Sequence, residues 1–150
     1  RLAGVETMCK IQINRHINVH GAYNYLYTSK DADGVRLSSY SPHYGNIRAE
    51  YNTRIPRYAT VVNLSGNIMG KKKFDVLDEL EIDGKKVEAY YQAKVNPYCL
   101  WDLTVSQYIM QNLRITAGIT NLFDYTSDRV TFNTSTSPGR NYFIACNYTL

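Results

Sequence analysis

The sequence predicts an all-β chain folded as an antiparallel meander of about seven strands. Apolar and polar residues alternate over most of its 150 residues, and successive side chains of a strand point to opposite faces of a sheet. The clearest pair lies in residues 101–124, WDLTVSQYIMQNLRITAGITNLFD, where two alternating runs flank a tight corner at Gln111–Asn112. Such a corner between alternating runs is typical of an antiparallel hairpin.

The remaining runs follow the same unit along the chain. Strands are expected at residues 2–13, 17–28, about 44–53, 58–69, in the two halves of 101–124, and after the loop 124–139. The connections alternate between short turns, at 14–16, 54–57 and 110–112, and long polar segments. The longest segment, 70–95, contains its own alternating hairpin, which is expected to turn at Asp83–Gly84.

The alternation divides the side chains into two faces. The apolar face is expected to point away from a barrel axis and includes Val19, Tyr23, Ile47, Val62, Leu64, Leu103, Val105, Ile115, Ile119 and Ile144. The polar face is expected to point inward and includes Glu6, Lys10, Asn24, Arg48, Glu50, Asn63, Arg114 and Asn147. Charged and amide groups make a poor core for a small protein but suit a wide, water-filled barrel. Cys9, Cys99 and Cys146 fall on the apolar face, where a reduced cysteine behaves as a small hydrophobe.

These features predict an arc of a large transmembrane β-barrel. No apolar run approaches the roughly 18 residues of a spanning helix, but a transmembrane barrel has none because half of each strand faces a polar lumen. Tight turns on one side and long loops on the other are typical of outer-membrane barrels. Single-chain bacterial barrels close with an even number of strands, so an odd number predicts that residues 1–150 form one segment of a longer protein.

Three segments together resemble TonB-dependent outer-membrane receptors. Residues 33–51, DGVRLSSYSPHYGNIRAEY, are similar to a receptor pattern that leads from an extracellular loop into a strand. Residues 101–124 match the penultimate strand pair, including its Asn-Leu-Phe-Asp ending, and residues 139–150, GRNYFIACNYTL, resemble the terminal strand. The order and spacing of the three segments identify the C-terminal part of such a barrel. Family members usually end on Phe or Trp, whereas this sequence stops at Leu150, so either Leu150 takes the place of that residue or a few residues follow it.

The resemblance implies a transport protein of the bacterial outer membrane and not an enzyme. Receptors of this family take up a scarce metal complex, such as a ferric siderophore, haem or a corrinoid. The implied partners are the remainder of the barrel and its plug, the TonB complex acting through the missing N-terminal part, the lipid bilayer, lipopolysaccharide and the metal complex. No nucleic acid and no resident cofactor are expected.

The candidate ligand contacts lie in the long connections, which the resemblance places outside the cell. They are His43, Lys71, Lys72, Tyr90, Tyr91, Tyr125 and Arg129. Aromatic rings can stack on a metal complex, and Lys or Arg can pair with its anionic groups. For Lys71–Lys73, a solvated loop base remains the alternative to binding an anionic ligand or lipopolysaccharide.

Other chemistry finds little support in the sequence. The histidines have no Ser or Cys nucleophile placed beside them. The acidic run from Asp75 to Asp83 lacks the spacing of a calcium loop, so no metal site is expected.

Two alternatives to the receptor remain open from the residues alone. A soluble β-sandwich would bury the apolar face of each strand against a second sheet. A passive porin would share the barrel physics but lack a plug.

Overall fold

The computed structural model of the chain describes residues 2–28, 41–53, 55–82, 85–109, 112–126 and 138–149. These residues form strands and turns and contain no helix. No helix suited to crossing a membrane is therefore found among them. In chain order the strands are β1 (Leu2–Gln12), β2 (Ile17–Thr28), β3 (His43–Asn52), β4 (Thr60–Met69), β5 (Lys72–Ile82), β6 (Lys85–Val95), β7 (Tyr98–Ile109), β8 (Leu113–Thr120) and β9 (Asn141–Tyr148).

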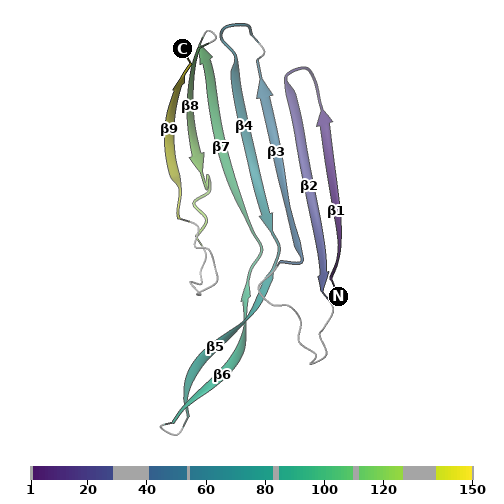
Figure 1. Cartoon of the computed structure of the whole chain (residues 1–150), viewed down its shortest axis with the longest axis vertical. Coiled ribbons are helices and arrows are strands. Elements are labelled where there is room, and N and C mark those ends of the chain that lie inside the picture. The colour runs from purple at the N-terminus through teal and green to yellow at the C-terminus, as the bar shows by residue number, and fades with distance from the viewer. Residues whose placement is uncertain are drawn as a thin grey trace.

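Seven of the strands form one antiparallel sheet in the order β1-β2-β3-β4-β7-β8-β9. The other two, β5 and β6, pair only with each other and form a long twisted hairpin that leaves the sheet between β4 and β7 (Figure 1). The strand ends that the short turns join lie at one end of the sheet, and the strand ends that lead into the long connections lie with the hairpin at the other end (Figure 1). The predicted meander, its short–long alternation and the separate hairpin within 70–95 are all confirmed, although Asp83 and Gly84 themselves lie outside the described residues.

The register assigns the side chains to the two expected faces. One continuous row across the sheet consists of Ile11, Val19, Ala49, Leu64, Leu103, Ile119 and Tyr142. The neighbouring row on the opposite face consists of Gln12, Asn18, Glu50, Asn63, Thr104, Gly118 and Phe143. All the residues expected to point outward share the first face, and all those expected to point inward share the second. Cys9, Cys99 and Cys146 lie on the apolar face as free thiols.

The described residues leave the apolar face of the sheet uncovered. Among the described side chains Val95 is the one hydrophobic residue that is buried, whereas Val5 is 62% exposed and Ile144 is 78% exposed. A β-sandwich requires a second sheet packed about 10 Å from the first. Seven of the described strands instead form a single layer, and the β5–β6 hairpin lies beyond the end of that layer (Figure 1). The sandwich alternative is therefore wrong.

Aromatic residues border the apolar band at both ends. Towards the long connections the apolar face carries Tyr23, Tyr25, Trp101 and Tyr142, and towards the short turns it carries Tyr51 and Tyr148. Such girdles are characteristic of barrel strands that cross a bilayer, because amphipathic rings suit the membrane interface. The distribution agrees with strands that expose their apolar faces to lipid.

The ends of some strands differ from the sequence-based bounds. The fourth strand was expected from residue 58 but begins at Thr60, because Arg57 has a φ of 73° and the Tyr58 amide donates to the Ile55 carbonyl at 3.3 Å. The first strand of the 101–124 pair begins at Tyr98, before the expected Trp101. β7 pairs with β4 from the Met69–Tyr98 pair onward. This pairing extends β7 towards its N-terminus, beyond the residues whose apolar–polar alternation predicted a strand.

Two glycines on the apolar face should differ sharply in their tolerance of a side chain. A Cβ at Gly45 would lie 2.6 Å from the backbone carbonyl oxygen of Ala22, while a Cβ at Gly21 would have its nearest neighbour at 3.9 Å. We expect Gly45→Ala to lower the free energy of unfolding by about 1–3 kcal/mol because the backbone of β2 must move. Gly21→Ala, the matched control, should leave it unchanged or slightly raise it. Urea unfolding of the full-length protein in lipid measures both, and equal losses would contradict the tight approach of β2 and β3.

Candidate functional site

Several of the candidate ligand contacts lie near the strand ends that lead into the long connections. The corner after β8 is the best-defined part, because both Asn121 and Asp124 have a left-handed backbone, with φ of 52° and 55°. Asparagine and aspartate tolerate this conformation better than other non-glycine residues. The Asn-Leu-Phe-Asp ending recognised in the sequence is thus a turn whose first and last residues need this tolerance.

Asn121 holds the corner together from its centre. The residue is 5% exposed, and its side-chain amide accepts a hydrogen bond from the Tyr125 backbone amide at 2.8 Å and donates one to the Tyr125 carbonyl at 2.7 Å. Its own backbone amide donates to Asp102 Oδ1 at 2.9 Å. The corner is therefore fastened to β7 through Asp102 and closed on itself through Tyr125.

Asp124 connects the same corner to the start of the last strand. Its Oδ1 accepts a hydrogen bond from the Arg140 amide at 2.6 Å. The Leu122 amide donates to the Trp101 carbonyl at 2.7 Å. The two ends of the long connection between β8 and β9 are thereby fixed to each other and to β7.

Tyr125 lies immediately beyond this corner. Its ring stacks on Tyr98, the first residue of β7, with ring centroids 4.9 Å apart and planes inclined by 9°. Both rings are half-buried. The sequence-based expectation of a loop position for Tyr125 holds, whereas its partner Tyr98 was missed because the two rings meet only through the pairing of β7 with β8.

The lysines lie at the base of the β5–β6 hairpin. Lys71 precedes β5 and is exposed, and Lys72 is the first residue of β5, opposite Val95. β7 then starts at Tyr98, directly after the hairpin. The hairpin base therefore carries three lysines, Lys71 just before β5 and Lys72 and Lys73 at its start, and an aromatic pair just past β6.

Of the three remaining candidates, two are placed by strand register and one is not described. Tyr90 and Tyr91 are consecutive residues of β6, opposite Leu77 and Val76. Arg129 lies outside the described residues.

His43 is not in a loop, contrary to the sequence-based prediction. It is the first residue of β3, paired with Tyr25, because the ladder continues beyond the polar segment: the Gly70 amide donates to the His43 carbonyl at 2.7 Å. Its Nδ1 lies 2.7 Å from the Tyr23 hydroxyl, and its ring centroid is 5.0 Å from that of Tyr25. His43 thus belongs to the aromatic girdle on the apolar face, apart from the other candidates.

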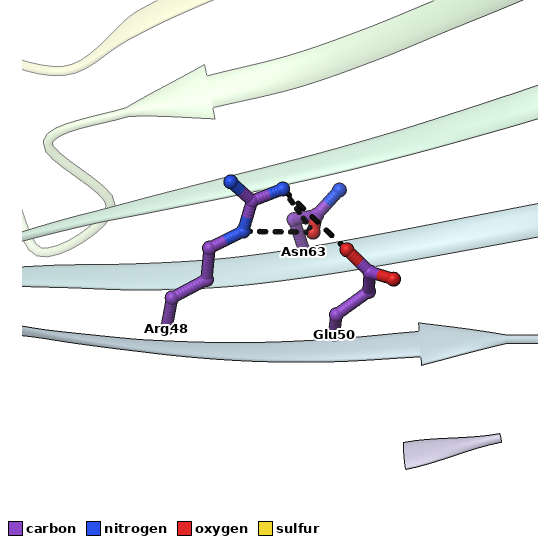
Figure 2. A network of polar contacts seen from close by, with 3 residues as sticks. All are labelled: Arg48, Glu50 and Asn63. Atoms are coloured by element: carbon purple, nitrogen blue, oxygen red, sulfur yellow. Dashed lines mark hydrogen bonds and ion pairs between the residues drawn. The ribbon is translucent and has the colours of Figure 1, made fainter. Parts of the chain in front are cut away.

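The polar face of the sheet carries a network of charged and amide groups on β3 and β4. The Arg48 guanidinium donates to Asn63 Oδ1 from Nε at 3.2 Å and from Nη2 at 2.8 Å, and Nη2 lies 3.6 Å from Glu50 Oε2 (Figure 2). The side chains of Arg48 and Glu50 remain 52% and 30% exposed. A partly exposed network of this kind contributes little to stability but suits the wall of an aqueous lumen.

Comparison with known proteins shows which fold the chain shares with solved structures. No protein-family model matches the chain, and no curated protein sequence matches it. Solved structures do match, and they are outer-membrane receptors. The resemblance to TonB-dependent receptors seen in the sequence is confirmed at the level of the fold.

Two of these structures are siderophore receptors of Pseudomonas aeruginosa. The ferripyoverdine receptor bound to ferripyoverdine superimposes with a TM-score of 0.74 at 18% identity, over 98% of this chain and 19% of that one. A substituted ferric enterobactin receptor gives 0.72 at 18% identity, over 98% of this chain and 22% of that one. A structure of the FpvAI–pyocin S2 complex gives 0.71 at 17% identity, over 98% and 19%. The chain spans about a fifth of the length of these receptors, and the similarity shows that it has the fold of part of such a barrel.

Proposed function

We propose that the chain is the C-terminal barrel segment of a TonB-dependent receptor in the bacterial outer membrane, and that this receptor imports a scarce metal complex. The observation that carries the proposal is a single-layered sheet with an exposed apolar face, aromatic girdles and a polar opposite face. Its similarity to two siderophore receptors favours a ferric siderophore over haem or a corrinoid. Because those receptors are transport proteins, the chain is assigned no enzymatic activity.

In this proposal the segment contributes wall, lumen lining and ligand-capturing loops. The remaining strands of the barrel would pair with β1 and β9, which have one partner each among the described strands. The plug would fill the lumen against the polar face that carries Arg48, Glu50 and Asn63. TonB would act on the N-terminal part of the receptor, and lipid and lipopolysaccharide would surround the apolar face.

The ligand would be met at the end of the sheet that carries the long connections. This end carries Lys71 and Lys72 at the hairpin base and the Tyr98–Tyr125 stack, with Tyr90 and Tyr91 on β6 of the hairpin. Arg129 is a further candidate from the sequence alone. Cations can pair with the anionic groups of a metal complex, and rings can pack on its organic part. His43, on the lipid-facing side of the girdle, is better suited to contact with lipopolysaccharide.

The proposal is tested with the full-length receptor in the outer membrane of cells with and without functional TonB. We expect uptake of one complex from a panel of ferric siderophores, haem and cobalamin, and expect that uptake to disappear without TonB. Uptake that continues without TonB would instead support a passive porin.

The double variant Lys71→Gln, Lys72→Gln should weaken binding of an anionic complex about fivefold. The control Lys10→Gln, which removes a positive charge from the polar face of β1, should not change it.

A further inference from the structure

The end of the sheet that carries the short turns contains a hollow that the proposed transport function does not use. It measures about 490 Å³ and is lined by Arg15, His16, Tyr51, Thr53 and Ile55. These residues come from the turn between β1 and β2 and from the end of β3 with the turn that follows. The hollow is open to its surroundings and is therefore a surface site accessible to a ligand.

The lining combines an apolar part with a cation. Tyr51 belongs to the apolar face of the sheet and is 45% exposed, and Ile55 is 54% exposed. Arg15 is exposed beside them in the neighbouring turn. The hollow is thus continuous with the apolar band on one side and positively charged on the other.

A chain of hydrogen bonds orients the cation. His16 Nδ1 lies 2.7 Å from the Asn52 carbonyl oxygen, which can only accept, so this nitrogen carries the hydrogen. The other ring nitrogen, Nε2, can then accept the hydrogen bond from Arg15 Nε at 3.0 Å. The turn itself is fixed by Asn14 Oδ1, which accepts from the amides of His16 and Ile17 at 2.8 and 2.9 Å. Arg15 is held through its Nε, which leaves its two terminal nitrogens for a ligand.

The charged residues in the sequence of the short connections are all of one sign. The short connections 13–16, 53–59 and 109–113 contain Arg15, Arg54 and Arg57 but no aspartate or glutamate. Arg57 is exposed in the second turn. This end of the sheet therefore attracts anions, and its neutralising partner must come from outside these turns.

We infer that this hollow binds the headgroup phosphate of an anionic phospholipid in the periplasmic leaflet. The terminal nitrogens of Arg15 match two phosphate oxygens in a bidentate arrangement. Tyr51 and Ile55 would pack on the glycerol and upper acyl region, since tyrosine suits the membrane interface. The inference rests on the proposed function, because that function places the short turns at the periplasmic surface and the apolar face in lipid.

The test uses the full-length receptor, purified in non-ionic detergent and titrated with phosphatidylglycerol or phosphatidylcholine under native mass spectrometry. We expect preferential retention of one phosphatidylglycerol, and expect Arg15→Gln to weaken it about tenfold through loss of a charge-assisted contact. Arg15→Lys keeps the positive charge but loses the paired guanidinium nitrogens, so its retention of phosphatidylglycerol should lie between that of the wild type and that of Arg15→Gln. Arg140→Gln, which removes an exposed arginine at the opposite end, is the matched control and should bind as the wild type does.

Each outcome distinguishes a lipid site from a simple anion site or from no site. Equal retention of the two lipids, or equal retention by wild type and Arg15→Gln, would overturn the inference. Displacement of the lipid by inorganic phosphate at equal concentration would also overturn it, because the hollow would then recognise the anion alone. Heat-modifiable migration on a gel verifies that each variant is folded. Metal-complex uptake, measured in the same Arg15→Gln variant, should be unchanged, so failure of the transport proposal would be visible independently.

Discussion

Replacing Leu64 by arginine is expected to lower the free energy of unfolding in lipid by about 2–4 kcal/mol. Leu64 lies near the middle of β4 on the apolar face, between Ala49 of β3 and Leu103 of β7. A guanidinium at this position would have to leave water and enter hydrocarbon with no acidic partner in the adjacent pairs. The loss arises from the environment of the face and not from the packing of a protein core.

The adjacent residue provides a control at the same depth. Ser65 points to the polar face, between Arg48 on β3 and Asp102 on β7, so Ser65→Arg gains one opposite charge and one like charge. We expect its effect to remain below about 1 kcal/mol. Urea unfolding of the full-length receptor in lipid vesicles measures both variants. Equal penalties at positions 64 and 65 would contradict the assignment of the two faces to lipid and lumen.

Replacing Asn121 by alanine is expected to lower the free energy of unfolding by about 3–4 kcal/mol, through lost hydrogen bonds and added backbone strain. The change removes the side-chain bonds to both backbone groups of Tyr125, at about 1 kcal/mol each. It also places a Cβ without a local hydrogen bond in a left-handed conformation, which adds about 1–2 kcal/mol. The corner should open first, so hydrogen exchange at the Tyr125 amide should accelerate in parallel with the loss measured by urea unfolding.

Two companion variants separate the contributions at this corner. Asn121→Gly loses the same side-chain bonds but adopts the positive φ without strain, so it should be about 1–2 kcal/mol less destabilising than Asn121→Ala. Phe123→Ala changes a residue of the same turn that is 69% exposed and should leave Tyr125 exchange unchanged. Equal acceleration of exchange at the Tyr125 amide by Asn121→Ala and Phe123→Ala would contradict the role assigned to the Asn121 side chain.

The strands, their order and the residues of each face could all be predicted from the sequence. Alternation with a period of two places residues such as Leu64 and Ser65 on opposite faces in any antiparallel pairing, and the tight turns favour a meander. The Asn-Leu-Phe-Asp ending could be recognised for a related reason, since a short local motif retains its turn in the fold.

The contacts between residues of different strands became visible only in the folded chain. The polar neighbours of His43 are typical of a loop, but pairing with Tyr25 and the bond from Gly70 make it part of β3. The Tyr98–Tyr125 stack and the hollow beside Arg15 likewise join residues that lie far apart in the sequence. Periodicity determines the face of a residue but carries no information on register, and register determines which side chains share a site.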